Sequence, residues 1–207
     1  MIVLPSRGRP DSLRQFFAIS RPMEPGILLL DEDDAQTYAG IDLPDNWTRQ
    51  IGPRAGYVTL LNRAFAQFPD EPWYACWGDD VRCSPAGWDT RLAALAGRER
   101  IAYGNDLLNG MQKCCLPVIG GDLVRRVGWL AYPALGHLYC DQIWHELGRA
   151  VGVLRYDPEV ITEHLHWSVG KQKYDQTAFE RPTEHDHTHF ATFMVHPFEE
   201  TMARCRV

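Results

Sequence analysis

Residues 73–80 have the sequence Trp73-Tyr74-Ala75-Cys76-Trp77-Gly78-Asp79-Asp80, in which an apolar run ends on a glycine and two adjacent carboxylates. A short apolar run of this kind is typical of a strand buried on both faces, and a glycine lets the backbone turn tightly after it. Mg²⁺ and Mn²⁺ bound to a diphosphate prefer hard oxygen ligands such as these carboxylates. An Asp-Asp pair after a strand is also common in turns and helix caps, so the pair alone leaves both interpretations open.

The same pattern, an apolar run followed by polar residues, occurs twice upstream. Ile2-Val3-Leu4 leads into Pro5-Ser6-Arg7-Gly8-Arg9-Pro10, and the run from Gly26 to Leu30 leads into Asp31-Glu32-Asp33-Asp34. The spacing of apolar residues predicts helices over 11–19, 56–67, 88–96 and 141–151, and further strands over 101–103 and 159–162. Alternating strands and helices predict an α/β domain, in which ligands collect beyond the carboxyl ends of the strands.

Composition and charge narrow the classes of protein that this chain represents. Its 207 residues suit one domain, with 45% hydrophobic and 23% charged residues. The net charge of −6 gives no general attraction to phosphate backbones, so a nucleic-acid partner needs a local basic patch. The candidates for that patch are Arg125, Arg126, Lys171 and Lys173.

The cysteines and the apolar runs indicate the compartment. Six cysteines contain no Cys-x-x-Cys pair, which favours reduced, mostly buried thiols. The apolar runs are too short to span a bilayer, and the Met1 end has no charged region followed by a cleavage site. We therefore expect no membrane insertion and a cytoplasmic location, the host cytoplasm if a phage encodes the chain.

The order of these motifs resembles the GT-A glycosyltransferases, especially family 2 and its compact phage-type members. The loop Pro5–Pro10 resembles the family's opening loop, and Asp31–Asp33 its acidic end of the second strand. Arg54–Asn62 resembles the segment that leads a helix across the donor site, and Gly78-Asp79-Asp80 the family's DxD element, with glycine in place of the first carboxylate. The resemblance implies a GT-A, Rossmann-like mixed sheet flanked by helices in a single domain.

The resemblance extends over roughly residues 1–175. Residues 176–207 are then expected to form a C-terminal tail that packs on the domain or is partly mobile. Within this tail, His185, His187 and His189 alternate with other residues, as the ligands of a second metal site do. No matching motif accompanies them elsewhere, so a solvated tail is the favoured interpretation.

The resemblance also implies roles for individual residues. The expected donor-binding residues are Pro5, Ser6, Arg7, Asp31, Arg54, Asp79 and Lys171. Asp80 is expected to bind Mn²⁺ or Mg²⁺ together with His164 or His166, because such enzymes often supply a last ligand from a C-terminal histidine. Asp141 is expected to act as the catalytic base, although an aspartate at this position can also simply cap the helix that follows.

The activity implied is a metal-dependent, inverting transfer of a hexose from a nucleoside-diphosphate donor, with UDP-sugars favoured, to a hydroxyl acceptor. A hydroxymethylated pyrimidine in phage DNA is the first candidate acceptor, and a cell-envelope saccharide or a protein side chain the second. The incomplete DxD element leaves a different class open, a non-catalytic module that binds a nucleotide sugar or a nucleic acid. Asn105 and Asp106 follow a predicted strand and either approach the ligand or form a turn.

Overall fold

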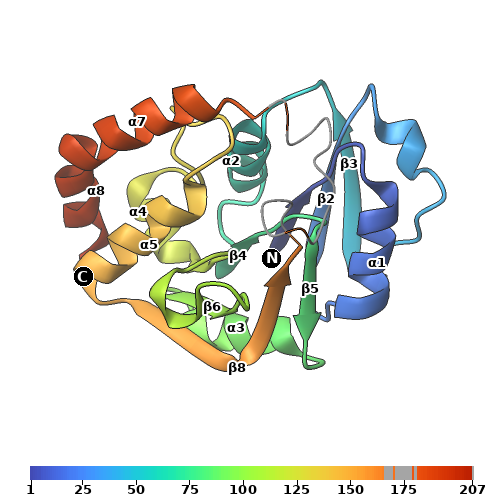
Figure 1. The fold of residues 1–207 in the computed structure, drawn as a ribbon, viewed down its shortest axis with the longest axis horizontal. Coiled ribbons are helices and arrows are strands. Elements are labelled where there is room, and N and C mark those ends of the chain that lie inside the picture. Colours follow the sequence, from blue (N-terminus) through green and yellow to red (C-terminus); the bar gives the residue numbers. More distant parts are fainter. Residues whose placement is uncertain (166–169, 171–178, 180, 207) are drawn as a thin grey trace.

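A computed structural model describes residues 1–165, 170, 179 and 181–206. The strands are β1 (Ile2–Pro5), β2 (Gly26–Asp31), β3 (Trp47–Gly52), β4 (Trp73–Cys76), β5 (Val81–Ser84), β6 (Ile101–Asn105), β7 (Val118–Gly120) and β8 (Leu154–His164). The helices are α1 (Pro10–Ser20), α2 (Tyr57–Gln67), α3 (Trp88–Ala96), α4 (Gly121–Val127), α5 (Cys140–Val151), α7 (Thr183–Val195) and α8 (Pro197–Cys205) (Figure 1). Short 3₁₀ helices lie at η1 (Ala35–Tyr38) and η2 (Gly110–Gln112).

In the part of the chain that the structure describes, eight strands form one mixed sheet in the order β3-β2-β1-β4-β7-β6-β8-β5. β1 pairs in parallel with both β2 and β4, and β2 pairs in parallel with β3. β7 runs antiparallel to β4 and β6, and β8 runs parallel to β6 but antiparallel to β5. The carboxyl ends of β1, β2, β3, β4, β6 and β8 therefore lie at one edge of the sheet.

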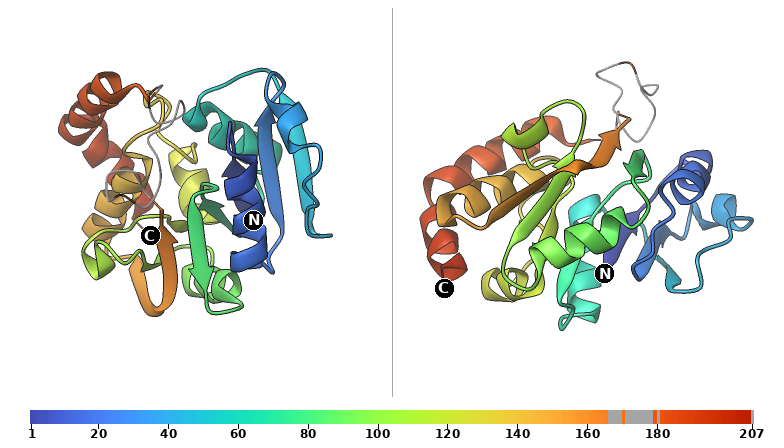
Figure 2. Two further views of the ribbon diagram at one scale, coloured as in Figure 1. Left: turned by 45° about the vertical axis from the view of Figure 1, so that its right-hand side comes forward. Right: turned by 90° about the horizontal axis from the view of Figure 1, so that it is seen from below.

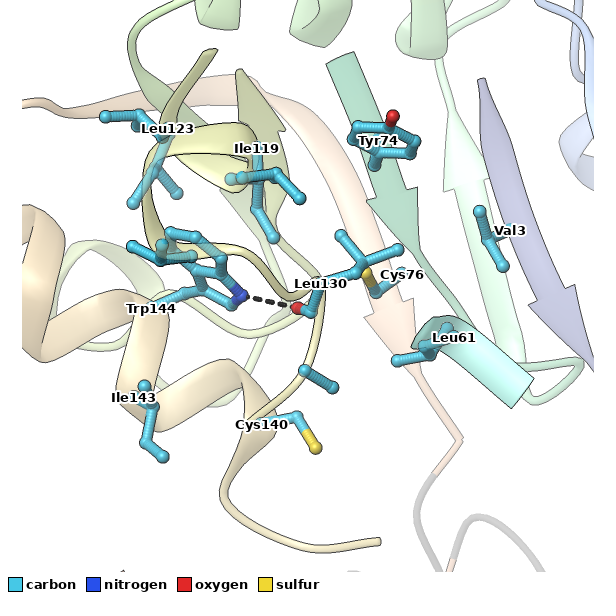
Figure 3. Packing of buried hydrophobic residues seen from close by; sticks show 14 of the residues in the cluster. Val3, Leu61, Tyr74, Cys76, Ile119, Leu123, Leu130, Cys140, Ile143 and Trp144 are labelled. Carbon is cyan, nitrogen blue, oxygen red and sulfur yellow. Dashed lines mark hydrogen bonds between the residues drawn. The ribbon is translucent and has the colours of Figure 1, made fainter. Parts of the chain in front are cut away.

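Two hydrophobic clusters cover the two faces of this sheet. Along β1, Val3 packs with residues of α2, α4 and α5, whereas Ile2 and Leu4 pack with residues of α1 and α3. Successive side chains of a strand point to opposite faces, so a continuous apolar run supplies both clusters. Figure 3 shows the first cluster, in which Trp144 Nε1 donates a hydrogen bond of 2.8 Å to the carbonyl oxygen of Leu130.

Helices α7 and α8 lie at one end of the molecule, far from α1 and β3 (Figures 1 and 2). α8 contacts α4 and α5, and Phe193 of α7 is fully buried in the first hydrophobic cluster. The division of the chain near residue 175 stays a prediction. None of the helices in the described ranges is long and apolar enough to cross a membrane.

Candidate functional site

One cavity of about 1060 Å³ opens at the edge where the parallel strands end. It is lined by the last residues of β2 and β8, by residues that follow β1, β3, β4 and β6, and by the start of α2 and the loop before α5. Nine residues predicted from the sequence line it, namely Pro5, Ser6, Arg7, Asp31, Arg54, Asp79, Asp80, Asp141 and His164. The topology thus brings together side chains that are far apart in the sequence.

Asp79 is held at the centre of this edge by hydrogen bonds from two serines. Ser6 Oγ lies 2.5 Å from Asp79 Oδ2 and 2.9 Å from the Tyr38 hydroxyl. Ser12 Oγ donates to the Asp79 carbonyl oxygen at 3.0 Å, as does Arg82 Nη1. β1 and β4 are neighbours, so the residues that follow them meet directly.

Asp80 meets His164 because β5 and β8 pair. The register sets Val81 opposite His164, and the Leu165 N–H donates to the Asp80 carbonyl oxygen at 2.8 Å. The His164 Nε2 atom consequently lies 3.4 Å from Asp80 Oδ1. This contact joins two of the three residues that the family resemblance implied as metal ligands, which are Asp80, His164 and His166.

Two arginines of the first loop reach different carboxylates. Arg9 Nη1 lies 3.2 Å from Asp80 Oδ2 and 3.6 Å from Asp79 Oδ1, and its side chain is only 10% exposed. Arg7 instead donates to Asp31 at 2.9 Å and to Asp33 at 2.7 Å. Arg9 is therefore the arginine at the central carboxylates, although nothing in the sequence favours it over Arg7.

The two adjacent carboxylates have pKa values shifted in opposite directions. Burial, together with the negative charge of Asp80, raises the pKa of Asp79. Burial also opposes ionisation of Asp80, but the hydrogen bond from His164 and the charge of Arg9 outweigh it and lower that pKa. Asp80 is thus the carboxylate that is charged at neutral pH, where it pairs with Arg9.

The donor set around Asp80 is compatible with Mn²⁺ or Mg²⁺. Carboxylate oxygen and neutral imidazole are both ligands that Mn²⁺ accepts. Two ligands at right angles, each about 2.1 Å from an octahedral ion, lie about 3.0 Å apart, close to the separation of the Asp80 and His164 atoms. Within the described residues no cluster of three or more histidine, cysteine or acidic side chains meets the geometry of a metal site, so substrate oxygens or water would have to complete the coordination.

Asp141 also lines the cavity. It belongs to the first turn of α5, whose N-cap position is Tyr139. Its Oδ1 accepts a hydrogen bond of 2.8 Å from the Gln142 N–H, and Lys113 Nζ lies 3.6 Å from Oδ2. Lys113 is a cavity residue that the sequence analysis missed, because only the fold brings the loop after β6 to α5.

The histidine-rich segment forms part of helix α7 and not a solvated tail. Asp186, within this segment, is fully buried. Its carboxylate accepts hydrogen bonds of 2.7, 2.8 and 2.7 Å from the N–H groups of Gly136, His137 and Leu138. We call this arrangement the Asp186 clamp, and the loop that it holds lines the cavity immediately before α5.

Other predicted residues lie away from the cavity or outside the described ranges. Arg125 and Arg126 lie on α4, away from the carboxyl edge, and form ion pairs with Asp122 and Glu99, so they form no basic patch at the cavity. The Asp106 carboxylate accepts hydrogen bonds from the three N–H groups of residues 108–110, as expected if this residue forms a turn. Asp106 also lines the cavity. His166, Lys171 and Lys173 lie outside the described residues.

The cysteines and Asn62 are structural. All six cysteines are free and buried, as predicted. Asn62, the last residue of the motif in α2, donates to the Ala131 carbonyl oxygen at 2.7 Å and accepts from the N–H groups of Leu130 and Ala131. It therefore fixes the loop behind the cavity instead of contacting a ligand.

Comparison with known proteins identifies the fold. A scan against models of known families finds no match, and no curated protein sequence matches. Among solved structures, the chain is similar to the mannosyltransferase PcManGT from Pyrobaculum calidifontis, which was solved in complex with GDP-Man and Mn²⁺. The match has a TM-score of 0.64 and 14% sequence identity, and it covers 98% of this chain and 67% of that chain. A Bacillus anthracis protein named as a glucose-1-phosphate thymidylyltransferase, solved with sucrose, matches at a TM-score of 0.48 and 10% identity over 76% of this chain and 85% of that chain. The fold is GT-A-like, as the sequence predicted.

Proposed function

We propose that this protein is a metal-dependent glycosyltransferase that uses a nucleotide-sugar donor. The observation that carries the proposal is the meeting of Asp79, Asp80 and His164 in one cavity at the carboxyl edge of the sheet, with Arg9 beside them. The likeness to a mannosyltransferase that binds GDP-Man and Mn²⁺ supports the same reaction class.

Each group of residues has a task in this reaction. Asp80 and His164 would hold Mn²⁺ or Mg²⁺, which when bound stabilises negative charge on the leaving diphosphate. Arg9 lies where a phosphate oxygen can replace its present carboxylate partners, because a guanidinium binds both groups through paired N–H donors. Pro5, Ser6, Arg7, Asp31 and Arg54 line the end of the cavity expected to bind the nucleoside.

Asp141 is proposed as the base that removes the proton of the acceptor hydroxyl. It lines the same cavity as the carboxylate pair but comes from α5, whereas the pair follows β4. A base at that position favours direct attack on the anomeric carbon and inversion of configuration, with no covalent enzyme intermediate. Family 2 membership, the compact phage type and a cytoplasmic location belong to the same proposal.

Release of nucleoside diphosphate from a panel of donors tests this proposal. The panel contains UDP-hexoses, which the sequence favoured, and GDP-mannose, each with Mn²⁺, with Mg²⁺ or with a chelator. We expect metal-dependent release that Asp80→Ala abolishes. Asp11→Ala, which removes an exposed partner of Arg14 outside the cavity, is the matched control and should retain activity. Donor binding without release from any donor would contradict a transferase and favour the non-catalytic binding module.

Hydroxymethylated DNA is the proposed acceptor in the same assay, against a cell-envelope saccharide as the alternative. Arg125 and Arg126 were candidates for a basic patch that binds DNA, but both form ion pairs with acidic residues, so they no longer support DNA as the acceptor. If hydroxymethylated DNA stimulates release and unmodified DNA does not, a modified base is the acceptor. Stimulation by saccharides alone would exclude it.

A further inference from the structure

The cavity has a second end that the donor residues do not occupy. It lies toward Asp141 and Lys113, between the loop after β6 and the loop before α5. Apolar side chains line the cavity from these two loops, namely Leu108, Cys115, Leu116 and Leu138, and the polar Asp106, Asn109 and Lys113 lie among them. Pockets with such walls bind ligands with an apolar surface and orient them through a few polar groups.

Two polar rings, those of Tyr57 and His137, also face this cavity. Tyr57 is the first residue of α2, and its ring centroid lies 5.0 Å from that of His137 in the loop before α5. The Val58 N–H donates to the Gly136 carbonyl oxygen at 3.4 Å, which fixes the two segments against each other. Both rings line the cavity.

Neither ring has a hydrogen-bond partner among the described residues. The Tyr57 hydroxyl and the two His137 ring nitrogens can together donate and accept hydrogen bonds. Burial, and next the charge of Arg181, lower the pKa of His137 to about 4, so its imidazole is neutral at pH 7. Half-buried polar groups that face a cavity without protein partners are available to a ligand.

Tyr57 lines the same cavity as the two carboxylates that the proposed reaction uses. Burial is the main cause of its raised pKa, and the nearby Cys76, Cys140, Asp141 and Asp80 add to it. The Tyr57 hydroxyl is therefore protonated at neutral pH and within electrostatic reach of both Asp141 and Asp80.

We propose that Tyr57 and His137 bind the acceptor by hydrogen bonds, and that the acceptor carries an apolar face next to its reactive hydroxyl. The inference rests on the glycosyltransferase function proposed above and specifies its acceptor site. The Asp186 clamp supports it, because a hydrogen bond of 2.8 Å from the His137 N–H holds that residue in place without a ligand. Side chains positioned in advance lose less entropy when they bind.

Acceptor kinetics with matched variants test this inference. Tyr57→Phe and His137→Asn remove the polar atoms, and Tyr132→Phe and His196→Asn make the same changes outside the cavity. The acceptors are benzyl alcohol and a 5-hydroxymethylpyrimidine nucleoside, both with an apolar face, and free hexoses. Affinity for the donor in the presence of Mn²⁺ is measured separately.

We expect each cavity variant to lower kcat/KM for the acceptor by about 10- to 100-fold, which is the loss of one or two hydrogen bonds. Donor affinity should change less than about twofold, and the control variants should behave as the unmodified protein. Free hexoses should have KM values at least about 10-fold higher than the acceptors with an apolar face.

Unchanged acceptor kinetics in both cavity variants, or free hexoses used as well as the other acceptors, would overturn this inference and leave the transferase standing. A protein that releases no nucleoside diphosphate from any donor overturns both. The two failures are therefore distinguishable in one set of assays.

Discussion

Replacing Asp186 by Asn should destabilise the protein strongly, although this residue lies outside the family motifs. The carboxylate is fully buried and accepts three main-chain hydrogen bonds. A hydrogen bond to a charged group contributes about 1.5–3 kcal/mol, and a buried donor left unsatisfied costs about 1–3 kcal/mol. Asn keeps one acceptor oxygen and turns an NH₂ group toward N–H donors, so we expect a loss of about 3–5 kcal/mol.

The loss is measured by thermal and urea unfolding. For a chain of this length, about 1 kcal/mol shifts Tm by about 2–4 °C, so Tm should fall by about 6–20 °C at pH 7. Asp122→Asn is the matched control, because Asp122 is partly exposed and pairs with arginines at the surface. Such a pair contributes about 0–1 kcal/mol, and the control should therefore change Tm by only a few degrees.

The pH dependence of this difference checks its cause. Burial opposes ionisation of Asp186, but the main-chain N–H groups and His185 outweigh it and lower its pKa in the fold. Its contribution is then complete above the pKa of an unfolded aspartate, about 3.9, and is lost as pH falls through the folded pKa. The gap between the protein and Asp186→Asn should narrow only below about pH 4. If Asp186→Asn and Asp122→Asn lose the same stability, the Asp186 clamp does not stabilise the fold as argued. The same conclusion would follow if the stability difference between the protein and Asp186→Asn stayed constant down to pH 3.

Three further predictions concern the fold and the metal site. Gly104→Ala should lower the unfolding free energy measured in urea by about 2–4 kcal/mol, because a Cβ there would lie 2.5 Å from a carbonyl oxygen of β8. Gly52→Ala is the control: there is open space around its Cβ, so it should change the unfolding free energy by less than about 1 kcal/mol. Asn62→Ala removes the hydrogen bonds to residues 130–131 and should lower the unfolding free energy by about 2–4 kcal/mol; no loss would show that the loop finds other partners. Asp80→Asn should weaken Mn²⁺ binding at least about 10-fold in calorimetry without donor, and unchanged affinity would place the metal elsewhere.

The strands that could be predicted are those with apolar residues on both faces. β1, β2, β4 and β6 are such runs, and all were expected from the sequence. β3 was not expected, because it is an edge strand with largely exposed polar side chains, which leave no apolar pattern. β7 is three residues long and is buried by its neighbours, so its own sequence contains too little signal.

The candidate site was predictable at the strand ends and less so elsewhere. Ser6 and Asp79 follow neighbouring strands, and an α/β topology is enough to bring them to one edge. Asp80 and His164 meet through β5, a strand whose inward charged residue Arg82 conceals it in the sequence. Their meeting was expected only from the family order of motifs. The Asp186 clamp had no local signal, because its partners are main-chain groups about fifty residues upstream.

The choice between Arg7 and Arg9 shows why a correct motif does not settle the role of each residue in it. In an extended chain, residues two apart point to the same side, and both arginines would then meet the same carboxylates. Gly8 between them has a φ of 68°, which reverses the chain, and its N–H donates to Asp34 Oδ2 at 2.6 Å. Arg7 is consequently directed to the end of β2 and Arg9 to the end of β4. A side chain at position 8 would strain this left-handed turn by about 1 kcal/mol, so the separation of the two arginines depends on the glycine between them.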